Sequence, residues 1–339
     1  RGGITAYSGE RPASAGTAYK KGDTLVSNIR PYLQKIWLAD RDGACSKDVL
    51  VFRSINTDSL LPEFLHLLLW QKDFFDYDMS TFTGTGRPRG DKDELLKYPI
   101  PVPTLSEQRA LIDGFNRLTD EINSKRQQIA ALKESVKSRF VEVFGDPVDG
   151  KKWPFVRLED LCTKLGSGAT PRGGKTAYKA EGVPLVRSMN VHNGRFVWKD
   201  LAYIDDEQAA KLEGVTLMKG DVLLNITGAS VARSCLLPDE LAGGRVNQHV
   251  SIVRVDQKRM LPVLLNTVLV SNSYQKLLLN GSRAAGATRE AITKEDLKRM
   301  TVPLPPLELQ QEFADFVAQV DKSQFSAAPP IWPSKSSQP

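Results

Sequence analysis

The sequence contains an internal duplication, in which short segments recur in the same order about 200 residues further along the chain. Residues 21–25 (KGDTL) recur as residues 219–223 (KGDVL), and each copy is followed by an asparagine, Asn28 or Asn225. The ordered set indicates a repeated structural unit, one globular domain followed by a helix. The other pairs are residues 49–53 with 250–254, 62–65 with 262–265, 83–87 with 285–289, 95–103 with 297–305, and 105–108 with 307–310.

The repeated segments predict the architecture of that unit. Residues 49–53 (VLVFR) and 250–254 (VSIVR) are short apolar runs typical of buried strands. The stretches that begin at Pro62 and Pro262 are apolar and predict helices. A chain of 339 residues is long enough for two domains that each bury a core. We therefore expect an α/β protein whose two domains contain small twisted sheets.

A long coiled-coil-like helix is expected between the two domains. It begins with a capping box, Thr104 to Glu107 (TLSE), and ends at Gly145. A helix of about 38 residues is ~57 Å long, which suits a spacer better than a single core. Apolar residues recur along this helix in the two rows typical of a coiled coil, and we expect them to pack on a partner. They are Leu111, Phe115, Leu118, Ile122, Ile129, Leu132 and Val136, and the pattern restarts in the second copy with Phe313, Val317 and Val320.

The two copies are unequal. Residues 151–205 have no counterpart before Lys21, so the first domain is expected to lack its front part. The second helix is expected to be short and to be followed by a Pro/Ser-rich disordered tail. The expected domains are 1–103 (partial first domain), 104–145 (spacer helix), 146–302 (second domain), 303–324 (short second helix) and 325–339 (tail).

Composition excludes several classes of protein. No apolar run approaches the ~20 residues that span a membrane, and the chain does not open on a signal peptide. Cys45, Cys162 and Cys235 are widely separated, which argues against a disulfide framework or a zinc site and suits a reducing cytoplasm. The net charge of +6 permits a nucleic-acid partner. Residues 151–200 carry ten Lys and Arg but only four acidic residues.

Catalytic motifs are not recognisable. The three histidines form no motif with Cys or Ser, and His66 lies in an apolar run (FLHLLLW) typical of a packed helix. The loop from Gly168 to Thr176 (GATPRGGKT) resembles a phosphate-binding P-loop, but its glycine spacing is wrong and no strongly apolar strand precedes it. An NTPase or nuclease that uses this loop is one alternative, and a structural coiled-coil scaffold is another.

Polar residues that suit DNA recognition occur where expected strands meet loops. Arginine can hydrogen-bond guanine, and asparagine or glutamine can hydrogen-bond adenine, through two bonds at once. Asparagine, glycine and threonine also simply form turns, which is the alternative interpretation. The candidate DNA-binding residues are Lys164, Ser167, Thr170, Arg172, Lys175, Arg187, Ser188, Asn190, Arg195, Asn225, Thr227, Asn247, Gln248 and Arg289, together with Asn28, Arg30 and Arg87 in the first copy.

With these segments laid out, the chain resembles the specificity subunit of type I restriction–modification systems. The likeness rests on residues 158–171 (LEDLCTKLGSGATP), 183–191 (VPLVRSMNV), 219–228 (KGDVLLNITG), 247–250 (NQHV), 101–108 (PVPTLSEQ) and 303–310 (PLPPLELQ). It implies two target-recognition domains that read the halves of a bipartite sequence in double-stranded DNA, with helices that set their spacing.

The resemblance also implies the partners. The helices would dock modification (methyltransferase) subunits and, in the whole complex, a restriction (translocase/nuclease) subunit. The chain itself would be non-catalytic and hold no cofactor or metal, because S-adenosylmethionine, ATP and Mg²⁺ would belong to those partners. The short second helix implies that the antiparallel helix pair typical of the family forms over only part of its length.

Overall fold

The computed structural model of the chain describes residues 16–81, 88–171, 173–283 and 291–327. The chain divides into two compact units, Arg1–Ser124 (unit 1) and Lys125–Pro339 (unit 2). The long helix α4 (Leu105–Phe144) contributes residues to both units. None of the helices in the described ranges combines the length and the hydrophobicity that crossing a membrane requires.

Unit 1 is built on a three-stranded antiparallel sheet in the order β3-β2-β5. Helices α1 and α2 follow this sheet in the chain, and apolar residues of β2, β3, α1 and α2 form one core. The elements of unit 1 are β1 (Thr17–Tyr19), β2 (Thr24–Ser27), β3 (Ile36–Leu38), β4 (Gly43–Cys45), β5 (Val49–Phe52), α1 (Pro62–Leu69), α2 (Lys72–Ser80) and α3 (Lys92–Leu95), with β1 paired to β4.

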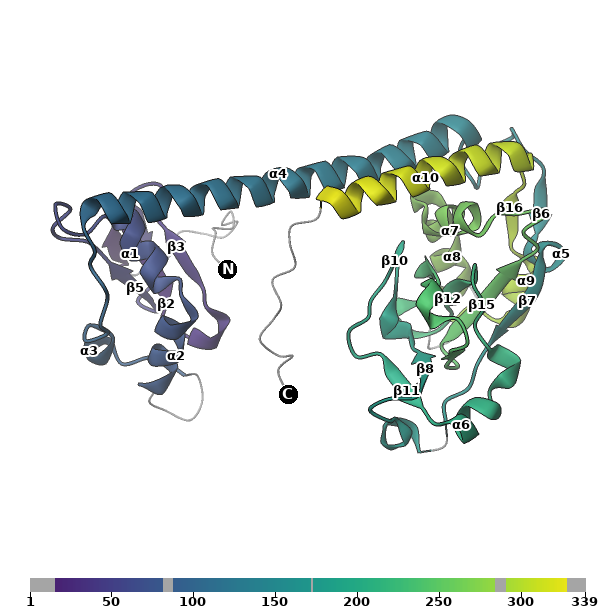
Figure 1. Cartoon of the computed structure of the whole chain (residues 1–339), viewed down its shortest axis with the longest axis horizontal. Helices are drawn as coiled ribbons and strands as arrows, with labels where there is room; N and C mark the ends of the chain where they lie inside the picture. Colours follow the sequence, from purple (N-terminus) through teal and green to yellow (C-terminus); the bar gives the residue numbers. More distant parts are fainter. Residues whose placement is uncertain (1–15, 82–87, 172, 284–290, 328–339) are drawn as a thin grey trace. The chain divides into compact units, whose positions relative to one another are not determined.

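Unit 2 is built on a four-stranded antiparallel sheet in the order β13-β12-β15-β7. Figure 1 shows helices α7 and α8 beside this sheet. The strands are apolar on both faces: Val222 and Leu224 of β12 pack in the cluster that contains the helices, whereas Leu223 packs in a second cluster. The elements are β7 (Cys162–Ser167), β12 (Val222–Asn225), β13 (Ser234–Leu236), β15 (Val250–Val255), α7 (Pro262–Val270) and α8 (Asn272–Arg283).

A second, three-stranded sheet of unit 2 has the order β11-β8-β14. Its residues Val186 and Val246 pack against Leu223 and Ile252 of the four-stranded sheet. Two-stranded ribbons join β9 to β10 and β6 to β16. The remaining elements are β6 (Phe155–Arg157), α5 (Leu158–Leu161), β8 (Val183–Val186), β9 (Val191–His192), β10 (Arg195–Phe196), β11 (Ala202–Ile204), α6 (Asp206–Ala210), β14 (Arg245–Val246), α9 (Lys294–Arg299), β16 (Thr301–Pro303) and α10 (Leu307–Ala327).

The duplication predicted from the sequence is confirmed in the hydrogen bonds of the two units. Each Lys-Gly-Asp segment turns through a glycine with positive φ, 89° at Gly22 and 80° at Gly220, a conformation that glycine adopts without steric cost. The aspartate that follows is buried and pairs with an arginine, which directly follows β5 in unit 1 and lies within β15 in unit 2. The two pairs are Asp23 with Arg53 (2.5 Å) and Asp221 with Arg254 (2.6 Å).

The helix-entry motifs are also equivalent in the two units. Gln108 accepts a hydrogen bond from Leu61 N (2.8 Å) and donates to Ser59 O and Pro103 O. Gln310 accepts from Leu261 N (2.8 Å) and donates to Arg259 O and Pro305 O. Both glutamines are fully buried. One side chain therefore ties the first turn of each long helix to the start of the apolar helix of its unit.

The predicted ends of the long helix are confirmed. Thr104 and Glu107 form the capping box, with Thr104 N donating to Glu107 Oε2 at 2.9 Å. Gly145 ends the helix with a φ of 78° and donates to Val141 O. Helix α10 extends to Ala327, three residues past the expected end at 324. Phe313 of α10 packs on α4, and tertiary packing of this kind stabilises α10 more than its local sequence alone would.

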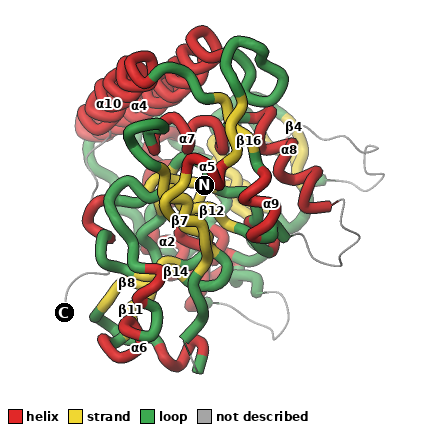
Figure 2. The backbone as a smooth tube through the Cα atoms, turned by 90° about the vertical axis from the view of Figure 1, so that its right-hand side faces the viewer, coloured by secondary structure: helices red, strands yellow, loops and turns green. Residues whose placement is uncertain are grey.

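Within unit 2, α10 lies along the C-terminal part of α4 (Figures 1 and 2). The ring of Phe313 lies 5.9 Å from that of Phe140 and 5.4 Å from that of Phe144. Among the described residues, the sheet of unit 1 has no strand equivalent to β7. The Gly-rich segments 83–87 and 285–289, which were paired in the duplication, lie outside the residues that the structure describes.

Candidate nucleic-acid interface

The C-terminal ends of three strands of unit 2 meet the start of a fourth at one edge of its sheets. Strands β8 and β14 run parallel, with Val186 opposite Val246, so the residues that follow both strands emerge together. Strands β12 and β15 are antiparallel, with Asn225 opposite Val250, so the end of β12 meets the start of β15. The loops enclose a cavity of about 820 Å³, here called the strand-edge pocket, which is lined by Ser188, Met189, Thr227, Gly228, Ala229, Ser230, Arg233, Gln248, His249 and Ala291.

A chain of hydrogen bonds links three side chains that line the strand-edge pocket. Gln248 Nε2 lies 3.2 Å from His249 Nε2, and His249 Nδ1 lies 2.5 Å from Thr227 Oγ1. An amide nitrogen can only donate, so in this arrangement His249 Nε2 accepts and its Nδ1 carries the proton. Thr227 Oγ1 then accepts from the imidazole, and its own hydroxyl hydrogen remains free to donate to a ligand. Thr170 Oγ1 donates to Gln248 Oε1 and holds the amide from the other side.

The asparagines predicted to contact DNA are buried in the structure. Asn225 Nδ2 donates to Ser188 O (2.9 Å) and to Ser230 Oγ (3.1 Å), which holds two walls of the pocket together. Asn190 Nδ2 donates to Val197 O at 2.9 Å. Asn247 Oδ1 accepts from the backbone of the pocket residue His249 at 3.1 Å. In this structure these side chains hold the loops in place, and a direct contact between them and a base stays a prediction.

Arg187 is also held by the protein itself. Its guanidinium lies 5.1 Å from the centre of the Tyr178 ring, in a cation–π contact, and its Nη2 donates to Asp200 O. Its Nε is buried and has no hydrogen-bond partner within the described part of the chain. Arg187 therefore anchors the loop that leads to Ser188, whose side chain lines the pocket.

The other predicted residues of unit 2 divide by position. Ser167 pairs with Ser251 at the start of β15 and, like Thr170, lies exposed at the edge where the pocket opens. Lys164 pairs with Arg254, three residues further along β15 and about 10 Å from that edge. Arg195 is exposed on the ribbon β9–β10. Arg172 and Arg289 and the side chain of Lys175 lie outside the described residues.

In unit 1, Asn28 directly follows β2, whereas its counterpart Asn225 is the last residue of β12. Arg30 lies two residues after Asn28, as Thr227 lies two residues after Asn225. Asn28 is buried, whereas Arg30 is exposed and has a φ of 53°, a left-handed conformation that is rare for a residue with a side chain. Arg87 lies outside the described residues.

The residues predicted from the sequence do not include Met189, Arg233 or His249 of the pocket. Met189 exposes 44% of its surface although it is apolar, and His249 takes part in the hydrogen-bond chain. Arg233 has no ion-pair partner among the residues that the structure describes. An unpaired arginine in a pocket whose described lining carries no carboxylate attracts an anionic ligand. The signals in the sequence were the segments 187–190 (RSMN) and 247–250 (NQHV), which contain Met189 and His249.

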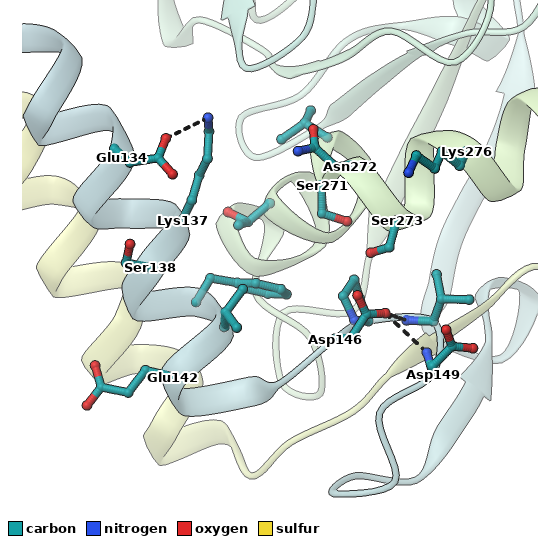
Figure 3. A pocket seen from close by; sticks show the side chains of 16 residues that line it. Glu134, Lys137, Ser138, Glu142, Asp146, Asp149, Ser271, Asn272, Ser273 and Lys276 are labelled. Carbon is teal, nitrogen blue, oxygen red and sulfur yellow. Dashed lines mark hydrogen bonds and ion pairs between the residues drawn. The ribbon is translucent and has the colours of Figure 1, made fainter.

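A second cavity, of about 950 Å³, lies between the C-terminal end of α4 and the start of α8 (Figure 3). It carries four carboxylates but two lysines, Lys137 and Lys276. Lys137 is paired with Glu134 (2.9 Å), and Asp146 accepts from the backbone amides of Val148 and Asp149. Excess negative charge repels DNA phosphates. The strand-edge pocket is therefore the better candidate, although it is the smaller of the two.

The residues predicted to contact a partner fall into two groups. Leu111, Leu118 and Ile122 of α4 are exposed, and Leu118 exposes 61% of its surface. The others are at least half-buried within their own units, so for most of them the packing that the heptad pattern predicted is intramolecular. These are Phe115, which packs on Trp70, and Ile129, Leu132, Val136, Phe313, Val317 and Val320, of which Val136, Phe313 and Val317 belong to the core of unit 2.

Comparison with known proteins gives one family. The family model described as type I restriction modification DNA specificity domain matches residues 6–134 and 150–327, one match in each half of the chain. The specificity subunit of the type I restriction enzyme MjaVIII from Methanocaldococcus jannaschii is 24% identical over 258 residues, which is 70% of this chain. That of EcoKI from Escherichia coli K12 is 23% identical over 65% of this chain. This chain spans 59% and 50% of the length of those two relatives.

Solved structures share the fold. The S subunit of a type I restriction–modification system from M. genitalium superposes with a TM-score of 0.59 at 13% identity, covering 96% of this chain and 82% of that one. A chain from a structure on complex assembly and conformational transition of a type I restriction–modification system gives a TM-score of 0.55 at 23% identity, covering 94% and 79%. At these identities the likeness concerns the fold alone.

Proposed function

The chain belongs to the family of type I restriction–modification DNA specificity proteins, and from this premise we propose that it reads a bipartite sequence in double-stranded DNA. One observation carries the proposal: the strand-edge pocket gathers hydrogen-bonding side chains and an unpaired arginine from three separate loops, on a rigid sheet. Side chains of this kind distinguish base pairs in the major groove. The equivalent strand ends in unit 1 supply the second half of the recognition.

In this proposal the strand-edge pocket contacts base edges rather than only phosphates. Ser188, Thr227 and Gln248 present donors and acceptors at its rim, and Met189 presents an apolar surface that suits a thymine methyl group. Gln248 is held by Thr170 on one side and by His249 on the other. A fixed amide loses little freedom on binding and distinguishes bases more sharply than a mobile one.

The exposed apolar row of α4 is the proposed docking surface for modification subunits. Leu111, Leu118 and Ile122 lie on the helix at successive spacings of seven and four residues, so they form one stripe. Exposed apolar stripes of this kind mark interaction surfaces. A restriction subunit would join the same complex.

We expect no catalysis by this chain alone. S-adenosylmethionine, ATP and Mg²⁺ would be bound by the partner subunits. The proposed site of action is the cytoplasm, where DNA is present and thiols stay reduced. The free state of Cys45, Cys162 and Cys235 suits such a compartment.

The test is selection of binding sequences from a random duplex library by the full chain. We expect enrichment of a motif in two parts separated by an unspecified spacer. Gln248→Ala should relax one position of the motif, with a loss of discrimination of about 1–3 kcal/mol there. The matched control is Gln257→Ala, an exposed glutamine beyond the other end of β15. A wild-type chain that binds all duplexes equally, with only a salt-dependent affinity, would refute sequence recognition.

A further inference from the structure

A pair of side chains in unit 1 occupies the place of the strand-edge pocket in unit 2. Asp48 directly precedes β5, as His249 directly precedes β15. Arg89 lies two residues before the N-cap of α3, as Ala291 lies two residues before the N-cap of α9. Arg89 and Ala291 each form an isolated bridge to the second residue after β2 and after β12, respectively. The same edge of the fold therefore carries Asp48 and Arg89 in unit 1.

We propose that Arg89 reads a guanine in the major groove of the DNA half-site bound by unit 1, and that Asp48 is its positioning residue. This inference rests on the proposed function and adds the chemistry of one contact to it. The inference also predicts that the two units recognise different bases at this position, because Ala291 of unit 2 has no side-chain donor.

The geometry of the pair leaves the guanine-binding side of the guanidinium free. Arg89 Nε and Nη2 both donate to Asp48 Oδ1, at 3.1 and 3.0 Å. These two donors lie along one side of the planar group. The Nη1 hydrogens and the second Nη2 hydrogen remain, and two of them form the fork at the outer end. That fork matches O6 and N7 of guanine, the commonest specific contact of arginine with DNA.

Both partners are fixed to the backbone of the sheet edge. The carbonyl of Asp48 accepts from Asn28 N at 2.8 Å, and the amide of Asp48 donates to Ser46 Oγ at 3.1 Å. On the other side, the carbonyl of Pro88 accepts from Arg30 N at 2.9 Å, next to Arg89. An arginine that is held on one side before DNA arrives loses less rotational freedom on binding.

The ion pair between Arg89 and Asp48 contributes little to the stability of the fold. The side chains of Arg89 and Asp48 are 50% and 45% exposed, and ion pairs that water reaches this freely stabilise a protein weakly. The structural pair of unit 1 is Arg53 with Asp23, whose carboxylate is buried. Lys47 beside Asp48 is also exposed and adds positive charge that attracts phosphates to this edge.

The experiment is the selection of duplexes by the full chain, with the frequency of each base measured at every position of both half-sites. Arg89→Ala should remove a guanine preference at one position of one half-site, a loss of discrimination of about 5- to 140-fold, and leave the other half-site unchanged. Arg89→Lys should fail to restore it, because an ammonium lacks the two-pronged fork. Asp48→Asn should weaken the same position without changing the thermal unfolding of the chain.

The matched control is Arg41→Ala. Arg41 forms an exposed pair with Asp40 at 2.6 Å, in the turn after β3, at the opposite end of the same sheet. It should leave both half-sites unchanged. If Arg89→Ala weakened all sequences equally and Arg89→Lys restored binding, Arg89 would contact a phosphate and the inference would be overturned. An unchanged motif would overturn it as well. A wild-type chain that selects no motif would instead contradict the proposed function itself.

Discussion

Replacing the buried glutamine at the start of α10 should destabilise unit 2 and leave unit 1 unaffected. Gln310 is fully buried and makes three hydrogen bonds to the backbone, one accepted from Leu261 N and two donated to Arg259 O and Pro305 O. Each bond contributes about 0.5–1.5 kcal/mol net, and each buried polar group left without a partner costs about 1–3 kcal/mol. Gln310→Ala should therefore reduce the stability of unit 2 by roughly 2–4 kcal/mol.

Hydrogen–deuterium exchange of the full chain is the assay, because it measures each unit separately where one unfolding curve would mix them. In Gln310→Ala, amides of α7 should exchange roughly 30- to 700-fold faster, which is the factor that corresponds to 2–4 kcal/mol. Amides of α1 should not change. Gln108→Ala, which removes the same three bonds in unit 1, should have the opposite pattern.

The control for this prediction is the adjacent glutamine. Gln311 is exposed and donates to Asp315, one turn further along the helix, so Gln311→Ala should change stability by less than about 0.5 kcal/mol. The reasoning is wrong if Gln310→Ala and Gln311→Ala accelerate exchange equally. It is also wrong if Gln310→Ala loosens α1 as much as α7, since the two units would then not hold their helices independently.

Two further predictions concern unit 1 and the helices. Burial without a hydrogen-bond partner among the described residues raises the pKa of Asp78 from 3.8 to about 6, so unit 1 should lose stability as pH rises from 4 through 6. Asp78→Asn should remove this dependence and stabilise unit 1 by about 1–2 kcal/mol at pH 7, measured by exchange at pH 5 and 7. Leu118→Asp should leave the chain folded but abolish co-purification with a modification subunit, whereas Phe313→Asp should unfold unit 2 by burying a charge. Retention of the modification subunit by Leu118→Asp would argue against docking on that stripe.

The scaffold could be predicted from the sequence because its signals are local. The capping box at Thr104 and the glycine at residue 145 define a helix by hydrogen bonds within one turn. Strand β15 contributes apolar side chains to both core clusters of unit 2, and residues 250–254 are predicted as a buried strand from their sequence. The repeat supported each assignment twice, since two diverged segments with the same pattern seldom share it by accident.

The exposure of the candidate residues could not be predicted, because it depends on segments far away in the chain. Asn225 ends β12 and Thr227 lies two residues further on, and the sequence alone does not indicate that one is buried and the other accessible. In the structure, the loops that contain Ser188 and Ser230 cover Asn225, whereas Thr227 faces the pocket. Arg187 is predicted to contact DNA, and the sequence does not indicate that its guanidinium also packs on the ring of Tyr178, nine residues before it.

The heptad pattern had a similar limit. It identifies an apolar stripe on α4 but does not say what covers the stripe. Part of the stripe, around Val136, packs in the core of unit 2 together with Phe313 of α10. Leu111 and Leu118 are exposed. Whether an apolar row meets its own chain or a partner is decided by where the second helix runs, which periodicity alone does not encode.

The two units share the residues that hold the fold and differ at the residues that face DNA in the proposal. Gln108 and Gln310 make the same three bonds, whereas Asp48 of unit 1 stands where unit 2 has His249, and Arg89 has an alanine as its counterpart. A change at an exposed edge alters the folding free energy by less than about 0.5 kcal/mol, but loss of a buried, hydrogen-bonded glutamine costs several times more. One scaffold can therefore carry two different sets of donors and acceptors without refolding. A chain built from two such units is suited to an asymmetric bipartite target, because identical half-sites would require identical edges.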